Sequence, residues 1–72
     1  MLSVLMSIYH KEKPEYFNQA MDSIWEHQTV KPDQVVLVED GPLTTELYDV
    51  IKNWKVKLGE VLDIISLEEN LG

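Results

Sequence analysis

Three short apolar runs alternate along this chain with two segments in which apolar residues recur every three or four positions. Short runs of β-branched and aliphatic residues are typical of buried strands, and the wider spacing is typical of helices with one apolar stripe. The pattern therefore predicts the order β-α-β-α-β. Strands that are joined through helices are parallel, so we expect an α/β fold with right-handed crossovers and helices on both faces of a three-stranded parallel sheet.

The expected strands cover residues 2–8, 35–38 and 61–67. Between them, the predicted helices carry apolar stripes made of Phe17, Ala20, Met21, Ile24 and Trp25 in the first and Leu47, Val50, Ile51, Trp54 and Leu58 in the second. Pro14 fits the first turn of the first helix, Thr44 or Thr45 can cap the second, and Gly59 is a stop signal. Trp25 and Trp54 belong to these stripes, which favours core packing over ligand stacking.

Charge and composition exclude several classes of function. Six Lys and Arg against thirteen Asp and Glu give a net charge of −7 over 72 residues, and there is no cysteine. Nucleic-acid binders need a basic face, so we expect no nucleic-acid partner. The chain has no secretory signal pattern and no apolar run near the ~20 residues that span a bilayer, so we expect a cytoplasmic chain without a membrane span.

The predicted site lies after the first two strands, because ligands of open parallel sheets bind beyond the carboxyl ends of the strands. Ser7, Tyr9 and His10 are at the end of the first strand, and Glu39-Asp40-Gly41-Pro42 ends the second. A carboxylate there can accept hydrogen bonds from a ribose hydroxyl or a base N–H, and a tyrosine can stack on the base. Turn formation alone explains Asp40-Gly41-Pro42 equally well.

Other familiar signals are absent. The first strand is not followed by G-x-G-x-x-G, and no G-x-x-x-x-G-K-[ST] occurs, which argues against a dinucleotide fold and a P-loop. His10 and His27 have no metal-binding spacing, so we expect no metal ligands in this segment. The pattern of residues by itself indicates a half of a nucleotide-binding fold.

Four segments in order resemble the amino-terminal part of family 2 glycosyltransferases. They are Ser3-Val4-Leu5-Met6-Ser7-Ile8-Tyr9-His10, then Ala20 to Thr29, then Val36-Leu37-Val38-Glu39-Asp40-Gly41, and finally Glu69-Asn70-Leu71-Gly72. Family members show a strand ending in S-x-Y-N, a helix ending in S-I-L-x-Q-T, a strand ending in V-D-D-G, and a later N-x-G. His10, Glu39 and Pro42 depart from the usual Asn, Asp and Ser.

The resemblance implies a Rossmann-like GT-A fold with strand order 3-2-1, in which residues 1–72 form one nucleotide-sugar-binding half-domain. Its full-length parent would transfer a sugar from a nucleotide-diphosphate donor, commonly UDP-linked, to an acceptor hydroxyl with inversion. By position, Ser7 and Tyr9 would line the uracil pocket and Asp40 would accept hydrogen bonds from base or ribose. Glu39 is the second acidic candidate.

The same resemblance implies parts that these 72 residues lack. Family members carry an Asp-x-Asp motif that holds Mg²⁺ or Mn²⁺ on the diphosphate, and an acidic general base. Neither is present here, so we expect no catalytic residue, no cofactor of the segment's own and no activity from the isolated chain, which we interpret as an amino-terminal piece of an enzyme of polysaccharide biosynthesis. The parent is expected to be cytoplasmic and membrane-associated.

Two alternatives and one corollary remain. The acidic turn after the second strand also resembles that of a response-regulator receiver, and a half-sheet can serve as a non-catalytic interaction domain. Nucleotide binding would separate both from the glycosyltransferase interpretation. With strand order 3-2-1, as in the family's first half, the first strand would pair with a later strand that these 72 residues lack. This leaves an unpaired apolar edge, so we expect homo-oligomers formed through that edge.

Overall fold

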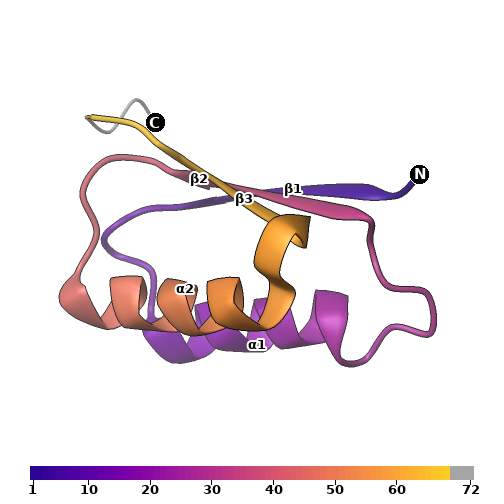
Figure 1. Cartoon of the computed structure of the whole chain (residues 1–72). Coiled ribbons are helices and arrows are strands. Elements are labelled where there is room, and N and C mark those ends of the chain that lie inside the picture. The colour runs from indigo at the N-terminus through magenta and orange to yellow at the C-terminus, as the bar shows by residue number, and fades with distance from the viewer. Residues whose placement is uncertain (69–72) are drawn as a thin grey trace.

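The computed structural model describes residues 1–68 and has the predicted order of elements. Strand β1 (Ser3–Ile8), helix α1 (Pro14–Trp25) and strand β2 (Gln34–Glu39) are followed by helix α2 (Thr45–Leu58), a short 3₁₀ turn (Gly59–Val61) and strand β3 (Leu62–Ser66). The strands are parallel in the order β1-β2-β3. The α/β class, the parallel sheet and the predicted strand order are thereby confirmed (Figure 1).

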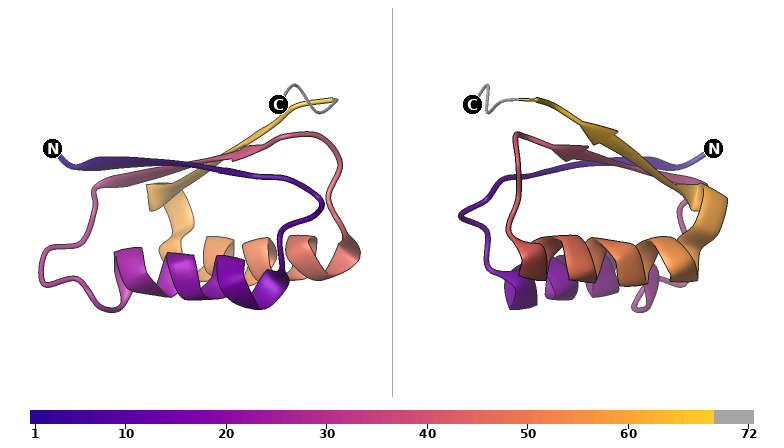
Figure 2. Two further views of the ribbon diagram at one scale, coloured as in Figure 1. Left: turned by 180° about the vertical axis from the view of Figure 1, so that it is seen from behind. Right: turned by 60° about the vertical axis from the view of Figure 1, so that its left-hand side comes forward.

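The predicted placement of helices on both faces of the sheet is wrong for the described residues. Both α1 and α2 lie on the same face, as the two views of Figure 2 show. Crossovers of one hand that step in the same direction, from β1 to β2 and from β2 to β3, put their helices on one side. The other face is open, and Leu5 and Ile65 on it are 75% and 48% exposed.

The core lies between the sheet and the two helices. Leu37 of the central strand and Met21, Leu47 and Leu62 are fully buried. Trp54 is buried as its stripe predicted, and its indole N–H donates to the Asn18 side-chain oxygen over 2.8 Å, which links α2 to α1. Trp25 is partly buried against the same core, with the Lys31 ammonium 5.0 Å from its ring centroid.

The helix ends follow the predicted signals. Pro14 occupies the first turn of α1. Of the two candidate caps of α2, Thr44 is the one used, because its hydroxyl accepts from the Leu47 N–H over 3.2 Å. Gly59 ends α2 with a φ of +60°, a conformation that glycine adopts without steric cost.

Replacing Thr44 by alanine is expected to lower the free energy of unfolding by about 0.5–2 kcal/mol, because the Leu47 N–H loses its only side-chain acceptor. Thr45→Ala is the matched control: it removes the same hydroxyl from the next, exposed position of the helix. Urea unfolding of both variants measures the difference. Equal losses would show that Thr44 does not act as the cap.

Candidate functional site

The carboxyl ends of all three strands meet at one end of the sheet, on the left in Figure 1. The loops that follow β1 and β2 leave from this end and descend to the two helices. The backbone ladder continues beyond β2, because the Asp40 N–H donates to the Ile8 carbonyl over 2.8 Å and the Leu67 N–H donates to the Glu39 carbonyl over 2.9 Å. The predicted site residues therefore sit on a fixed part of the backbone.

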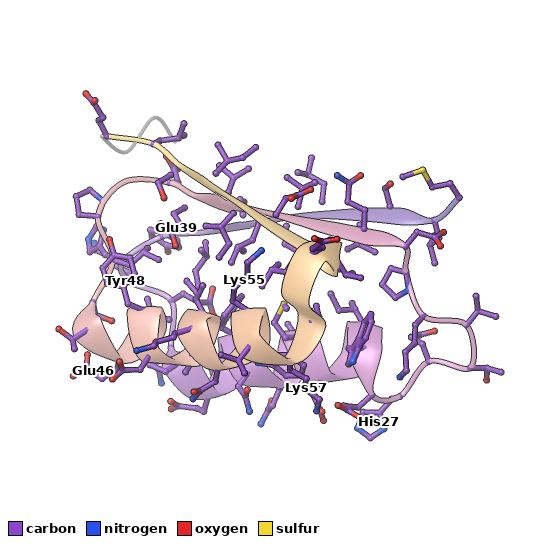
Figure 3. All side chains as sticks on the ribbon, viewed as in Figure 1. His27, Glu39, Glu46, Tyr48, Lys55 and Lys57 are labelled. Atoms are coloured by element: carbon purple, nitrogen blue, oxygen red, sulfur yellow. The ribbon has the colours of Figure 1, made fainter. Side chains whose placement is uncertain are left out.

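Glu39 is a buried carboxylate at the end of the central strand. It is 6% exposed and lies on the helix-covered face, between its ladder partners Ile8 and Ser66. The Ser66 hydroxyl donates to Glu39 Oε1 over 2.6 Å. Figure 3 shows the Glu39 side chain between the sheet and the helix layer. The contact ties the ends of β2 and β3 together, which is a structural role.

The loop after Glu39 is held by hydrogen bonds at both ends. Gly41 is buried, adopts a φ of +88°, and donates its N–H to the Glu39 carbonyl over 3.0 Å, which makes a tight turn around Asp40. Further along, the Leu43 N–H donates to the Tyr48 hydroxyl over 2.9 Å. Turn formation therefore accounts for the sequence Asp40-Gly41-Pro42. The Asp40 side chain is half-buried in this turn.

Ser7 and Tyr9 lie at the end of β1. The Ser7 side chain points to the open face, opposite Val38, and is exposed. Tyr9 is 43% exposed, and its carbonyl accepts from the Glu12 N–H over 3.0 Å, so the backbone reverses directly after it. Its ring meets the His10 ring edge-on, with centroids 5.9 Å apart. A partly exposed aromatic ring on a fixed turn is suited to stacking against a flat ligand.

The structure separates Ser7 and Glu39, because alternation along the two paired strands places them on opposite faces of the sheet. Glu39 is directed into the core. Tyr9 and Asp40 follow the last residues of β1 and β2, each at a turn of the backbone. All four residues therefore lie at the carboxyl end of the sheet, and only Glu39 is buried.

Other polar candidates lie elsewhere. His27 is at the opposite end of the molecule in Figure 3 and contacts Asp22 over 2.9 Å. Asp63 is near the start of β3 and accepts from the Gln34 amide over 2.7 Å. Within residues 1–68, no group of three His, Cys, Asp or Glu side chains is arranged to hold a metal ion.

Two functional neighbours were not predicted from the sequence. Ser66 is visible as a polar interruption of the third apolar run, but its partner Glu39 is defined only by the strand register. Tyr48 lies beside the buried Leu47 on α2, and no sequence signal connects its hydroxyl with the Leu43 N–H.

Two further observations concern the chain as a whole. The segment Glu69-Asn70-Leu71-Gly72, which carries the N-x-G-like motif, lies outside the described residues. Among the residues that the structure describes, neither helix has the length and apolar character needed to cross a bilayer.

Comparisons with known proteins point to one class of enzyme. No protein-family model and no solved structure matches the chain. Among curated proteins, it is 46% identical over all 72 residues to the amylovoran biosynthesis glycosyltransferase AmsE of Erwinia amylovora. It is 41% identical over 70 residues to the UDP-Gal:alpha-D-GlcNAc-diphosphoundecaprenol beta-1,3-galactosyltransferase of Escherichia coli, and 39% identical over 70 residues to an uncharacterized glycosyltransferase of Haemophilus influenzae.

These matches cover 100%, 97% and 97% of the chain but 26%, 24% and 25% of the respective relatives. The chain thus spans about a quarter of the length of the curated relatives it matches, and the matched part is amino-terminal. The homologues of this chain are glycosyltransferases, which agrees with the class that its sequence motifs resemble.

Proposed function

We propose that this chain is the nucleotide-binding part of a family 2 glycosyltransferase with a GT-A fold, and that its ligand is the nucleotide of a UDP-sugar donor. The match of nearly the whole chain to three glycosyltransferases carries this proposal. One of them is named for a UDP-galactose donor and a diphosphoundecaprenol-linked acceptor. For the whole enzyme we propose a comparable reaction, transfer to an acceptor hydroxyl with inversion, on the cytoplasmic side of a membrane.

The proposed nucleotide site consists of Ser7, Tyr9 and Asp40 at the carboxyl ends of β1 and β2. The exposed ring of Tyr9 offers a stacking surface for the base. Asp40 follows the adjacent strand and can accept hydrogen bonds from the base N–H or a ribose hydroxyl. The Ser7 hydroxyl, two residues before Tyr9, can donate to a base carbonyl. Glu39 stabilises the site from the helix-covered face, because its hydrogen bond with Ser66 holds the end of β2 to the end of β3.

The chemical step requires groups that we place outside these residues. Sugar transfer forms a bond from the acceptor oxygen to the anomeric carbon and breaks the bond from that carbon to the diphosphate. We propose that the general base, and the divalent metal that stabilises the diphosphate, are held by other parts of the enzyme, because the described residues offer no fitting metal group. The role proposed for this segment is to bind and orient the nucleotide.

The receiver alternative is disfavoured by the position of the acidic residues. A receiver needs carboxylates of different strands gathered at the carboxyl end around a Mg²⁺ ion. Asp63 instead lies near the amino end of β3, on the open face, and its carboxylate accepts a hydrogen bond from the Gln34 side-chain amide. The interaction-domain alternative predicts no nucleotide binding, and the titration below tests it directly.

The test is an amide NMR titration of the 72-residue chain with UDP at millimolar concentration. We expect shifts concentrated at Ser7, Tyr9 and Asp40. Asp40→Ala is expected to weaken binding by about 10- to 100-fold, the value of a hydrogen bond to a charged group. Thr45→Ala, on the helix surface, serves as the unaffected control.

Two results would contradict the proposal. Shifts that are absent, or spread over the surface without a maximum at the carboxyl end, would indicate that this segment does not bind the nucleotide. Equal shifts with UDP and with inorganic phosphate would show recognition of the phosphate alone, which contradicts a base-stacking role for Tyr9.

A further inference from the structure

The loop between β2 and α2 is held by three backbone N–H groups, and one of them donates to a side chain. The N–H groups of Asp40 and Gly41 donate to backbone carbonyls over 2.8 Å and 3.0 Å. Pro42 has no N–H to donate. The next N–H along the chain, that of Leu43, donates to the Tyr48 hydroxyl over 2.9 Å. The conformation of this loop therefore depends on one side chain that a substitution can change.

The geometry of α2 explains how Tyr48 reaches back to the loop. Thr44 is the N-cap of α2, so Leu43 directly precedes the cap and Tyr48 is the fourth residue of the helix. Side chains on a helix lean towards its amino end, and residues at these two positions commonly pack together. Figure 3 shows the Tyr48 side chain near the start of α2, on the side of the end of β2. Its hydroxyl adds a hydrogen bond that fixes how the chain enters the helix.

The held N–H groups matter for Asp40 because the loop is short and contains a flexible residue. Residues 41–43 are all that separate Asp40 from the helix cap. Gly41 adopts a φ of +88°, and glycine is the residue with the largest conformational freedom. The Asp40 N–H bond holds the chain before this glycine, and the bond from Leu43 to Tyr48 holds it afterwards. Both are needed to keep the turn around Asp40 in one conformation.

The following inference rests on the nucleotide site proposed above. We propose that Tyr48 is a positioning residue of that site: its hydroxyl fixes Leu43, and through the loop it fixes the Asp40 carboxylate that accepts hydrogen bonds from the nucleotide. Tyr48 acts without touching the ligand. An acceptor that is already in place binds more tightly, because less conformational freedom is lost when the ligand arrives.

Tyr48→Phe tests this role, because it removes the hydroxyl and keeps the ring. In the amide NMR titration of the 72-residue chain, we expect this variant to bind UDP about 3- to 10-fold more weakly than the wild type, the value of one hydrogen bond. Before any nucleotide is added, the Leu43 N–H should exchange with solvent several fold faster in Tyr48→Phe, since its acceptor is gone.

Two control variants separate this role from general effects. Tyr16→Phe makes the same change on α1, where Tyr16 is 56% exposed and its ring, which phenylalanine retains, lies 5.3 Å from the Lys13 ammonium. Thr44→Ala weakens the same end of α2 but leaves the Tyr48 hydroxyl in place. Both variants should bind UDP as the wild type does, and circular dichroism verifies that all variants are folded.

A double variant tests whether Tyr48 acts through Asp40. Asp40→Asn keeps an acceptor oxygen without its charge, so it forms weaker hydrogen bonds with the nucleotide. If Tyr48 positions this acceptor, removing its hydroxyl should reduce UDP affinity by a smaller factor in the Asp40→Asn background than in the wild type. Groups that act independently would instead give losses that multiply in full.

Three results would overturn the inference: unchanged UDP affinity in Tyr48→Phe, an equal loss in Thr44→Ala, or fully independent losses in the double variant. An equal loss in Thr44→Ala would mean that loosening the helix end is enough to weaken binding. A wild-type chain that binds no UDP contradicts the proposed function itself and removes the basis of this inference. That failure is distinguishable from the other three, because each of them requires a wild type that binds.

Discussion

Leu37→Ala is expected to lower the free energy of unfolding by about 2–5 kcal/mol, through lost burial and the cavity that remains. Leu37 is fully buried in the central strand, between Met6 of β1 and Ile64 of β3, and faces the helices. A chain of 72 residues has a total stability of roughly 4–11 kcal/mol. The substitution therefore removes a large share of the total, and urea unfolding followed by circular dichroism will show a much lower midpoint.

Ile65→Ala is the control for this experiment. Ile65 lies on the neighbouring strand but on the open face, where it is 48% exposed. Its truncation is expected to cost less than about 1 kcal/mol, since little buried area is lost and no cavity forms. If Ile65→Ala were as damaging as Leu37→Ala, the open face would be covered in solution, and the one-sided arrangement of the helices would not describe the folded state.

The helices were predictable from the sequence because their signals are local. The spacing of Phe17 and Met21, and of Leu47, Ile51 and Trp54, defines one face of a helix without reference to the rest of the chain. The end signals Pro14 and Gly59 act within a single turn. The three strands and their order follow from the alternation, since short right-handed crossovers connect neighbouring strands.

The apolar runs by themselves do not predict the one-sided sheet. The run Val35 to Val38 is apolar at every position, as in a strand buried on both faces. The direction of the two crossovers decides which face the helices cover, and the expected strand order 3-2-1 with right-handed crossovers already places both helices on one side. The direction also explains why Leu5 and Ile65, apolar like their neighbours, are exposed.

The candidate site was predictable as a place but not as a set of contacts. The carboxyl ends of the strands locate Ser7, Tyr9, Glu39 and Asp40 at one end of the sheet. From the sequence, the adjacent acids Glu39 and Asp40 are both candidates for binding the nucleotide. The structure separates them, because Glu39 is the last residue of β2 and is buried, whereas Asp40 is half-buried in the turn that follows.

Because of this separation, we expect substitutions of the two acids to change different quantities. Glu39→Ala should lower the stability of the fold, whereas Asp40→Ala should weaken nucleotide binding. Glu39→Ala leaves the Ser66 hydroxyl without its acceptor and opens a gap beside the buried Ile8, so we expect a loss of about 1–3 kcal/mol in the free energy of unfolding. Glu39→Gln retains an acceptor oxygen for Ser66 and should lose less. Urea unfolding of both variants measures this.

At a temperature where Glu39→Ala remains folded, its affinity for UDP is expected to stay within a few fold of the wild type, whereas Asp40→Ala weakens binding by about 10- to 100-fold. The reason is that Glu39 is directed into the core and holds β2 to β3, while Asp40 is half-buried in the turn after β2, next to the end of β1. If Glu39→Ala abolished UDP binding with its stability intact, the roles of the two acids would be exchanged. The nucleotide would then have to reach the helix-covered side of the sheet.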